Sequence, residues 1–241
     1  MSVPKAGATA GTRDSLRDGR GRSITSEVSV ADDGGVSGFV GLVLVPDAAT
    51  IAAAYRLARS VIADGAESML VRGSLPHVTL TQCALRDAPR SRLIALIDRL
   101  EERLSTARIP LGPLTVFGGG FVFWCVEPGS PARGVLQAAH QDALALAAGL
   151  LDPAANAAIV EGTAKLTGDD PVLVALARRY GYAFVGERYL PHVTLGYDSR
   201  LAAGATLAEP ARVHEMRVER VALARLGRYG VVQSLISFFA G

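Results

Sequence analysis

Four residues suited to proton transfer and anion binding occur in two identical copies of one pentapeptide. Pro76-His77-Val78-Thr79-Leu80 returns as Pro191-His192-Val193-Thr194-Leu195, and the two copies hold two of the four histidines in the chain. Imidazole titrates near neutral pH, so one ring can take a proton from an attacking water or hydroxyl while the other gives a proton to a leaving oxygen. Threonine hydroxyls can donate hydrogen bonds to the anionic oxygens of a phosphoryl group. The pair predicts acid–base chemistry on an anion, without a metal.

Each copy has the composition of a β-strand, because it is apolar and rich in β-branched residues. Side chains two residues apart point to the same face of a strand. His77 and Thr79 therefore share one face of the first strand, and His192 and Thr194 share one face of the second. We expect each strand to present one imidazole beside one hydroxyl, on a rigid element with an apolar back.

Strand alternation also yields weaker substrate-binding candidates. Thr81 continues the face of the first motif, and Arg188 and Gly196 continue that of the second if no bulge intervenes. An arginine could hold a phosphate through two hydrogen bonds, although a surface ion pair is the alternative interpretation, and a glycine could leave room for substrate. The same alternation points Tyr197 away from the second histidine, which favours core packing over stacking on a base.

The remaining histidines, His140 and His214, are expected to be surface or structural residues. His140 lies in a helical stretch beside polar residues, and His214 precedes Glu215 in an alternating strand. The two motif histidines cannot complete a metal site of three or four ligands, and the chain has no tight His-x-His or Cys-x-x-Cys set. We therefore expect no metal and no other cofactor. Serine-hydrolase, nucleotide-triphosphate and nicotinamide motifs are also missing, so those chemistries have no support.

Paired His-x-Thr motifs with apolar flanks, one in each half of a chain of this size, resemble the two-histidine (2H) phosphoesterase superfamily, which includes RNA-ligase-like and cyclic phosphodiesterase proteins. The resemblance extends over residues 36–240 by the order of elements and by the motifs. It implies a bilobal α+β fold: two pseudo-symmetric lobes of antiparallel sheet, with helices packed outside and a central cleft between the lobes.

The resemblance also implies a reaction and its residues. Such proteins hydrolyse or form 2′,3′-cyclic or 2′-linked phosphodiesters without a metal. Carried onto this chain, His77 and His192 would be the acid and the base, and Thr79 and Thr194 the phosphate ligands. Many relatives have a basic residue where this chain has Tyr197, so the usual substrate contacts do not carry over at that position.

Composition restricts the partners and the compartment. The chain has 241 residues, 49% of them hydrophobic, and a net charge of +2. That charge does not indicate a surface that coats nucleic acid, so we expect a monomer that acts on a small phosphorylated nucleotide or an RNA end. Cys83 and Cys125 have apolar neighbours and indicate buried thiols in a reducing compartment. With no signal-like segment and no apolar run long enough to span a bilayer, we expect no membrane association and a cytoplasmic location.

The order of elements predicts one domain, residues 36–240, behind a flexible polar arm of residues 1–35. Phe121, Phe123 and Trp124 are assigned to its core. The first part of the domain is expected to contain a strand over 39–45, a helix from Asp47 to about Asp64 with a stop at Gly65, the first motif strand, and a helix opened by Asp87 and Pro89. A glycine-linked hairpin of 114–117 and 121–126 and a helix from Ser130 to about Leu151, which Pro153 ends, are expected next. The last part is expected to contain an insertion over 154–169, a helix over 170–180, a second motif strand over 188–197, and a closing hairpin of 213–226 and 231–239.

Two alternatives to a hydrolase remain open. One is an RNA-binding or nucleotide-sensing module that keeps the cleft but turns nothing over. The other is an RNA end ligase, which would run the reverse reaction. The sequence does not assign which histidine is the acid and which is the base.

Overall fold

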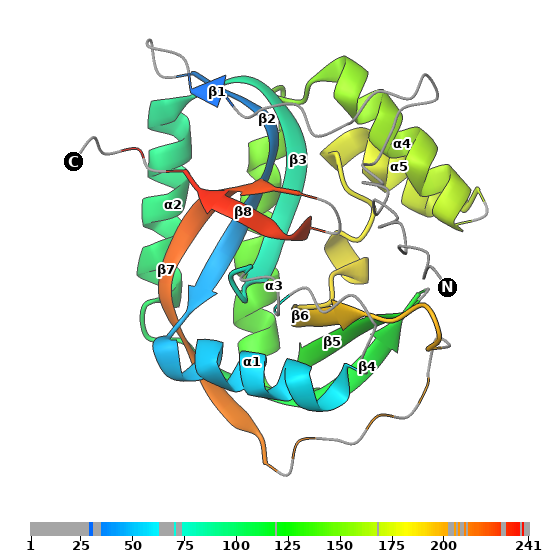
Figure 1. The fold of residues 1–241 in the computed structure, drawn as a ribbon. Helices are drawn as coiled ribbons and strands as arrows, with labels where there is room; N and C mark the ends of the chain where they lie inside the picture. Colours follow the sequence, from blue (N-terminus) through cyan, green and yellow to red (C-terminus); the bar gives the residue numbers. More distant parts are fainter. Residues whose placement is uncertain are drawn as a thin grey trace, which may run out of the picture.

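A computed structural model describes residues 29–30, 35–62, 70, 74–118, 120–167, 169–201, 205, 207, 210, 212–227, 230–236 and 238. These residues form an α+β fold of antiparallel strands with helices packed around them, which confirms the predicted class (Figure 1). Most of the expected arm of residues 1–35 lies outside the described residues. Within it, Ser29–Val30 form a short strand, β1, which pairs antiparallel with the next strand.

The described strands form one sheet that closes on itself. Their order is β1-β2-β3-β6-β5-β4-β7-β8, and a further pairing between β2 and β7 completes a ring. Every pairing is antiparallel. The remaining strands are β2 (Gly35–Pro46), β3 (Val78–Pro89), β4 (Arg108–Phe117), β5 (Phe121–Val126), β6 (His192–Tyr197), β7 (His214–Leu226) and β8 (Val232–Leu235).

Two halves can be distinguished in this sheet, and each contains one motif strand. We call β2, β3, β8 and residues 218–226 of β7 the first half, and β4, β5, β6 and residues 214–217 of β7 the second half. β7 runs through both halves, and β3 meets β6 at the pair Val78 and Val193. The two lobes implied by the family resemblance are therefore not separate sheets.

Helix starts follow their capping residues. Asp47 accepts a hydrogen bond from the Thr50 amide at the start of α1 (Ala48–Val61). Ser130 and Asp170 cap α3 (Pro131–Ala143) and α5 (Pro171–Tyr180) in the same way, each with proline as the first helical residue. α2 (Arg90–Leu104) lacks a side-chain cap but buries the predicted stripe of leucines Leu93, Leu96, Leu100 and Leu104.

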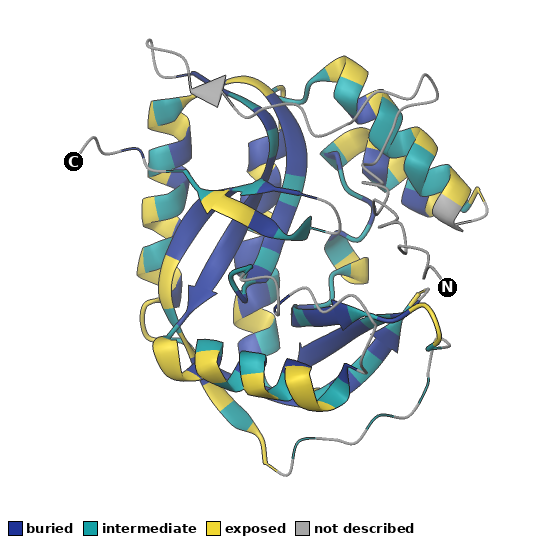
Figure 2. Cartoon of the chain, in the orientation of Figure 1, coloured by how far each residue is buried: buried dark blue, intermediate teal, exposed yellow. Residues whose placement is uncertain are grey.

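The helices cover the apolar side of the motif strands. α1 packs on β6 and β7, α2 packs on β3 and β7, and α3 packs on β3 and α2. Figure 2 shows strands that are largely buried, and helices α1 and α2 with exposed residues on one side. Val78, Leu80, Val193 and Leu195 belong to the largest buried cluster, so the predicted apolar back of each motif strand is confirmed.

Pro153 begins a helix instead of ending one. α3 stops at Ala143, a 3-10 turn η1 (Leu144–Ala147) follows, and Pro153 is the first residue of α4 (Pro153–Thr167). Proline is tolerated there because the first amide of a helix has no intrahelical partner. Asp152 accepts a hydrogen bond from Ala155 and caps the new helix. The predicted helix to Leu151 was therefore wrong, and the expected insertion over 154–169 is mainly α4, which packs on α5.

Other element boundaries shift by a few residues. β3 continues to Pro89, so the helix expected from Asp87 begins at Arg90. The second motif strand begins at His192 and not at Arg188, which belongs to the 3-10 turn η2 (Gly186–Arg188). The expected stop at Gly65 and the end of the closing hairpin at Phe239 lie outside the described residues. Over the part of the chain that is described, no helix combines the length and apolarity required to cross a bilayer.

Candidate active site

The two motif strands meet at their central valines. Val78 of β3 and Val193 of β6 form an antiparallel pair. This register aligns His77 with Thr194 and Thr79 with His192, so all four predicted residues belong to one face at the junction. Each of the four is partly exposed, whereas Val78 and Val193 are fully buried. The structure thus brings together the four residues that the repeated pentapeptide predicted.

Both histidine rings are oriented by the same local bond. Nδ1 of His77 lies 2.9 Å from the carbonyl oxygen of Leu75, and Nδ1 of His192 lies 2.6 Å from that of Leu190. A carbonyl only accepts, so Nδ1 must donate, and Nε2 is the nitrogen that can exchange a proton with a substrate. His77 has a second main-chain hydrogen-bond partner, Gly230, which has no counterpart at His192. Leu75 and Leu190 are themselves identical, so the repeat spans six residues. This extra identity was a sequence signal for the orienting carbonyl.

A β-bulge follows each threonine. In β3 the extra residue is Leu80, because its two neighbours pair with consecutive residues of β2. In β6 the extra residue is Leu195 by the same criterion against β5. A bulge interrupts the alternation of side chains, so the faces assigned beyond each threonine from sequence are exchanged. The two halves share this irregularity as well as the motif.

The bulges change which neighbours join the site face. Thr81 and Gly196 occupy equivalent positions and are both buried. Thr81 is 1% exposed, and its Oγ1 has no hydrogen-bond partner among the residues that the structure describes. Neither lies with the motif histidines on the exposed face. Gln82 and Tyr197 come next and are partly exposed. The prediction that Tyr197 points away from His192 was therefore wrong, because it assumed an uninterrupted strand.

Arg188 lies in η2 and not in a strand, so the alternation that suggested it does not apply. Its side chain is exposed four residues before His192. The strand pairing does not bring it beside the motif residues, and a contact with substrate stays a prediction.

Aromatic side chains surround His192. Its ring stacks on Phe123, with centroids 3.6 Å apart and an interplanar angle of 20°. Phe121 pairs with Tyr197 across β5 and β6, and their ring centroids are 5.0 Å apart. Phe117 lies 5.4 Å from Phe123 and 5.2 Å from Phe184 between ring centroids. We call Phe117, Phe121, Phe123, Phe184 and Tyr197 the aromatic face.

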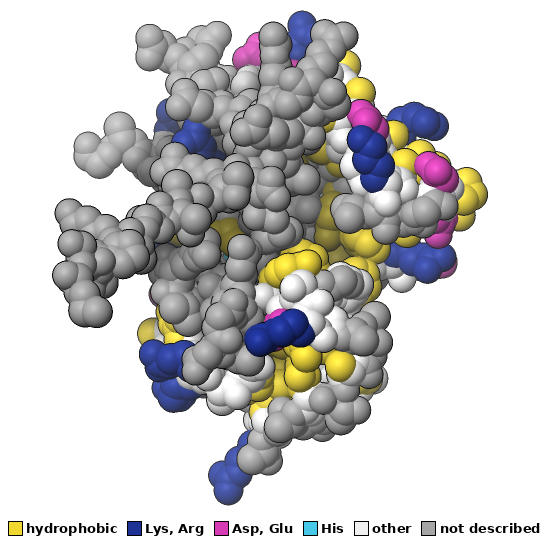
Figure 3. All heavy atoms as spheres, turned by 45° about the vertical axis from the view of Figure 1, so that its right-hand side comes forward, with side chains coloured by type: hydrophobic (Ala, Val, Ile, Leu, Met, Phe, Trp, Pro, Cys, Tyr) yellow, Lys and Arg dark blue, Asp and Glu magenta, His cyan; other side chains and the backbone are white. Residues whose placement is uncertain are grey.

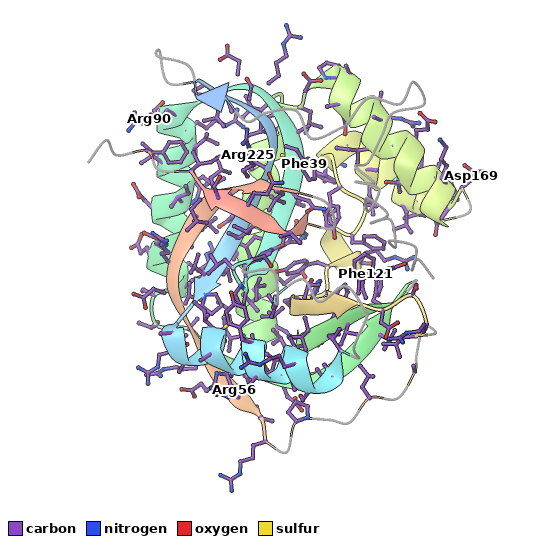
Figure 4. The ribbon with its side chains drawn as sticks, viewed as in Figure 1. Phe39, Arg56, Arg90, Phe121, Asp169 and Arg225 are labelled. Carbon is purple, nitrogen blue, oxygen red and sulfur yellow. The ribbon has the colours of Figure 1, made fainter. Side chains whose placement is uncertain are left out.

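The aromatic face is accessible in part. Phe121 and Tyr197 are partly exposed, whereas Phe123 is buried beneath them. Figure 4 places Phe121 between β6 and the α4–α5 pair, and Figure 3 shows hydrophobic side chains near the middle of that side of the molecule. Of the three aromatic residues assigned to the core from sequence, Trp124 alone belongs to the main buried cluster.

Small aliphatic side chains lie beside the first motif instead, where Val43 of β2 pairs with Thr79. A second buried cluster on β2, β7 and β8 contains Val43, Val45, Ala222, Ala224, Leu226 and Val232, and Leu75 packs against it. We call this cluster the aliphatic face. The main chain of Gly230, which has a φ of 75°, also lies near His77.

The electrostatics couple the two rings. Burial lowers the pKa of His77, and hydrogen bonding to the main chain of Leu75 and Gly230 opposes that shift. Burial also lowers the pKa of His192 to about 4, with the Leu190 carbonyl opposing and the charge of His77 adding to the decrease. An effect of one ring on the other requires that they lie close together. The two rings are therefore expected to titrate as a coupled pair.

The other histidines and the cysteines lie elsewhere. Nε2 of His214 lies 2.9 Å from Oγ1 of Thr50, and His140 is fully buried in α3, so both are structural. Cys83 and Cys125 are buried and unpaired, as predicted, and burial raises the pKa of both thiols. Within the described ranges, no three His, Cys, Asp or Glu side chains gather as metal ligands would.

Comparison with known proteins supports the fold. No protein-family model and no curated protein sequence matches this chain. Among solved structures, the chain is similar to the crystal structure of TT0787 of Thermus thermophilus, with a TM-score of 0.50 and 20% sequence identity. The likeness covers 83% of this chain and 95% of that chain. At this identity it is a likeness of fold alone.

Proposed function

We propose that this protein is a metal-independent phosphodiesterase of the two-histidine class. Its substrates would be 2′,3′-cyclic phosphates, 2′-5′ linkages or related cyclic nucleotides and RNA ends. The observation that carries the proposal is the junction of β3 and β6, where two His-x-Thr units from distant parts of the chain share one face and their rings interact electrostatically. The resemblance of the motifs to the 2H phosphoesterase superfamily agrees with this reaction.

His77 would be the general acid and His192 the general base. Two main-chain groups favour the protonated form of His77, whereas His192 has one such group and is further disfavoured by the charge of its partner. Binding of an anionic phosphodiester between the rings raises both pKa values, and the first proton goes to His77. That arrangement leaves Nε2 of His192 free to accept a proton.

Water is the second substrate of the proposed hydrolysis. Nε2 of His192 takes a proton from water, and the water oxygen forms a bond to phosphorus. The bond between phosphorus and the departing ribose oxygen breaks, and that oxygen takes its proton from Nε2 of His77. The product is a phosphomonoester with a free hydroxyl. The proton on His192 then returns to His77 through solvent, which resets the pair.

Thr79 and Thr194 would hold the two non-bridging oxygens. Neither hydroxyl has a hydrogen-bond partner among the described residues, and both belong to the face that carries the rings. Donors directed at the charge that develops on phosphorus oxygens stabilise the transition state more than the ground state. The two threonines therefore supply the anion-binding part of the site.

The aromatic face supports a substrate that carries a base. Phe121 and Tyr197 present ring surfaces beside His192, and stacking of a nucleobase on an aromatic ring stabilises binding by about 1–3 kcal/mol. Because stacking tolerates any base, it agrees with a range of nucleotides more than with one sequence.

A panel of nucleotides tests the proposal. The protein is incubated with 2′,3′-cyclic mononucleotides, 3′,5′-cyclic mononucleotides and 2′-5′ linked dinucleotides, each with and without EDTA, and products are separated by chromatography. We expect hydrolysis of a cyclic or 2′-linked member, unchanged by EDTA and lost in the double variant H77A/H192A. Binding without product would favour the nucleotide-sensing alternative, and activity that EDTA abolishes would contradict the proposal.

A further inference from the structure

His140 is a fully buried residue of α3 whose ring uses both of its nitrogens. Nδ1 lies 2.6 Å from the carbonyl oxygen of Leu80, and the amide of Gly186 donates to Nε2 at 2.8 Å. The ring also stacks on Tyr189, with centroids 4.1 Å apart and an interplanar angle of 6°. One side chain thus contacts the first motif strand and the segment that leads into the second.

These partners fix the chemical state of the ring. The Leu80 carbonyl only accepts, so Nδ1 of His140 carries the proton, and the Gly186 amide donates, so Nε2 presents its lone pair. The ring is therefore neutral, and burial lowers its pKa in agreement with that state. Since both nitrogens are engaged, His140 has none left for a metal or a substrate proton.

On the first motif, His140 holds the bulge. Leu80 follows Thr79 directly and is the extra residue of β3. A bulged residue is left out of the ladder between strands, so its main chain needs another partner. The bond from His140 supplies that partner at the carbonyl. This bond therefore holds the main chain of the residue next to Thr79.

On the second motif, α3 holds the main chain just before His192. Gly186 donates its amide to His140, and its carbonyl accepts a hydrogen bond of 3.0 Å from Gln137, one helical turn earlier in α3. Tyr189, which stacks on His140, immediately precedes Leu190. The carbonyl of Leu190 is the group that orients the His192 ring.

We propose that His140 is a positioning residue that keeps the two motifs aligned, so that His77 and His192 face the same phosphoryl group. The described pairing between β3 and β6 is the pair Val78 and Val193, and His140 adds a second link between the segments that carry the motifs. Its catalytic consequence rests on the proposed function, whereas the alignment itself can be measured without turnover.

Three variants of His140 separate its two bonds. H140L removes both with little change of volume, H140N keeps a donor toward Leu80, and H140Q keeps an acceptor toward Gly186. The matched control is N156L, which removes another buried side chain that binds a distant carbonyl, that of Arg178, in the α4–α5 pair. Circular dichroism and thermal unfolding give the folded fraction of each variant.

The alignment is read from the two motif rings by NMR titration of the histidine imidazoles. The charge of His77 lowers the pKa of His192, so we expect the pair to titrate in two separate steps in the wild type. We expect H140L to bring these steps closer together, while N156L leaves them unchanged. H140N and H140Q should lie between the wild type and H140L.

Turnover gives the second measurement. Displacement of reacting groups by about 1 Å can cost about 100-fold in rate, so we expect H140L to lower kcat at least 10-fold per folded molecule. Partial recovery is expected in H140N or H140Q. The proposal is overturned if folded H140L, or both single-bond variants when H140L does not fold, keep the wild-type titration steps. If the wild type turns over no phosphodiester, the proposed function fails, yet the titration still tests the alignment.

Discussion

The two copies of one hexapeptide occupy different surroundings, and the contrast bears on their roles. His77 and His192 share an orienting carbonyl, a following bulge and a buried valine neighbour. Around them, however, His77 lies by small aliphatic side chains and the main chain of Gly230, whereas His192 stacks on Phe123 within the aromatic face. Local sequence sets the geometry of each unit, and the neighbouring strands set its chemistry.

This contrast indicates a division of labour. A ring with two main-chain hydrogen bonds keeps its proton more easily than a ring that stacks on phenylalanine and feels the charge of its partner. The proton donor is therefore expected in the first half of the sheet, and the acceptor in the second half. The aromatic face beside the acceptor is also the place where a base would stack, which orients the substrate relative to the two rings.

The largest expected effects are those of the motif histidines, and two substrates with different leaving groups distinguish the general acid from the general base. H77A and H192A should each lower kcat/KM for a 2′,3′-cyclic nucleotide by about 10²–10⁴-fold, the usual contribution of general acid or base catalysis. A 4-nitrophenyl ester of a nucleoside phosphate releases an anion that needs no proton. On that ester H77A should approach wild-type turnover, whereas H192A should stay impaired, as measured by steady-state kinetics.

H214A is the control for loss of a histidine outside the site, because its ring contacts Thr50 and not the motifs. It should retain activity on both substrates. If the 4-nitrophenyl ester restored the activity of H192A and not that of H77A, His192 would be the general acid and His77 the general base. Equal losses on both substrates would show that the two surroundings do not differentiate the rings.

A smaller effect is expected from the aromatic face. F121A and Y197A each remove a partly exposed ring near His192. Since stacking of a base on one ring is worth about 1–3 kcal/mol, each should lower kcat/KM for a cyclic nucleotide by roughly 5- to 150-fold. Neither should change hydrolysis of ribose 2′,3′-cyclic phosphate, which has no base. Comparison of the two substrates in each variant measures the contribution of stacking.

Phe39 provides the matched aromatic control on the first half of the sheet. It packs against the aliphatic face and lies on β2 beside β3, away from Phe121 (Figure 4). F39A should affect both substrates to the same extent. A loss in F121A and Y197A that is equal with and without a base would mean that the aromatic face only maintains structure.

The motif residues could be predicted from the sequence, because a strand has a fixed period of two and the pentapeptide is repeated without change. Tyr197 could not be placed, since the bulge at Leu195 depends on how β6 pairs with β5. The same limit applies to Thr81 beyond the bulge at Leu80. Hydrophobic character alone also assigned Phe121 to the core, although the register turns it toward the site.

Long-range contacts were equally beyond local patterns. His140 binds partners 60 and 46 residues away in the chain, and nothing in its helical neighbours indicates them. Pro153 shows a different limit: Asp-Pro can end one helix or begin another, and only the packing of α4 on α5 decides between these outcomes. Local rules therefore predicted the elements, whereas tertiary contacts determined how those elements form the site.

The smallest expected effect concerns stability in acid, and it compares the rings without any substrate. Burial lowers the pKa of His192 from 6.5 to about 4, so between these values the unfolded chain binds a proton that the folded protein does not. Stability from this group is complete above pH 6.5 and is lost as the pH falls toward 4. A shift of one pKa unit corresponds to about 1.4 kcal/mol, and solvent near a half-buried ring reduces it, so we expect a loss on the order of 1–2 kcal/mol.

Urea unfolding at pH 7 and pH 4.5 measures this loss for the wild type, H192Q and the non-titrating control T194V. H192Q should lose less stability than the wild type between the two pH values, and T194V should lose as much. H77Q should also lose less than the wild type, because burial lowers the pKa of His77 too. Asp47 and Asp198, whose lowered pKa values also favour the fold at higher pH, are present in every variant, so their contribution cancels in the comparison. Equal acid sensitivity of the wild type and H192Q would mean that His192 is solvated like an ordinary surface histidine, and the contrast between the two rings would then have no electrostatic basis.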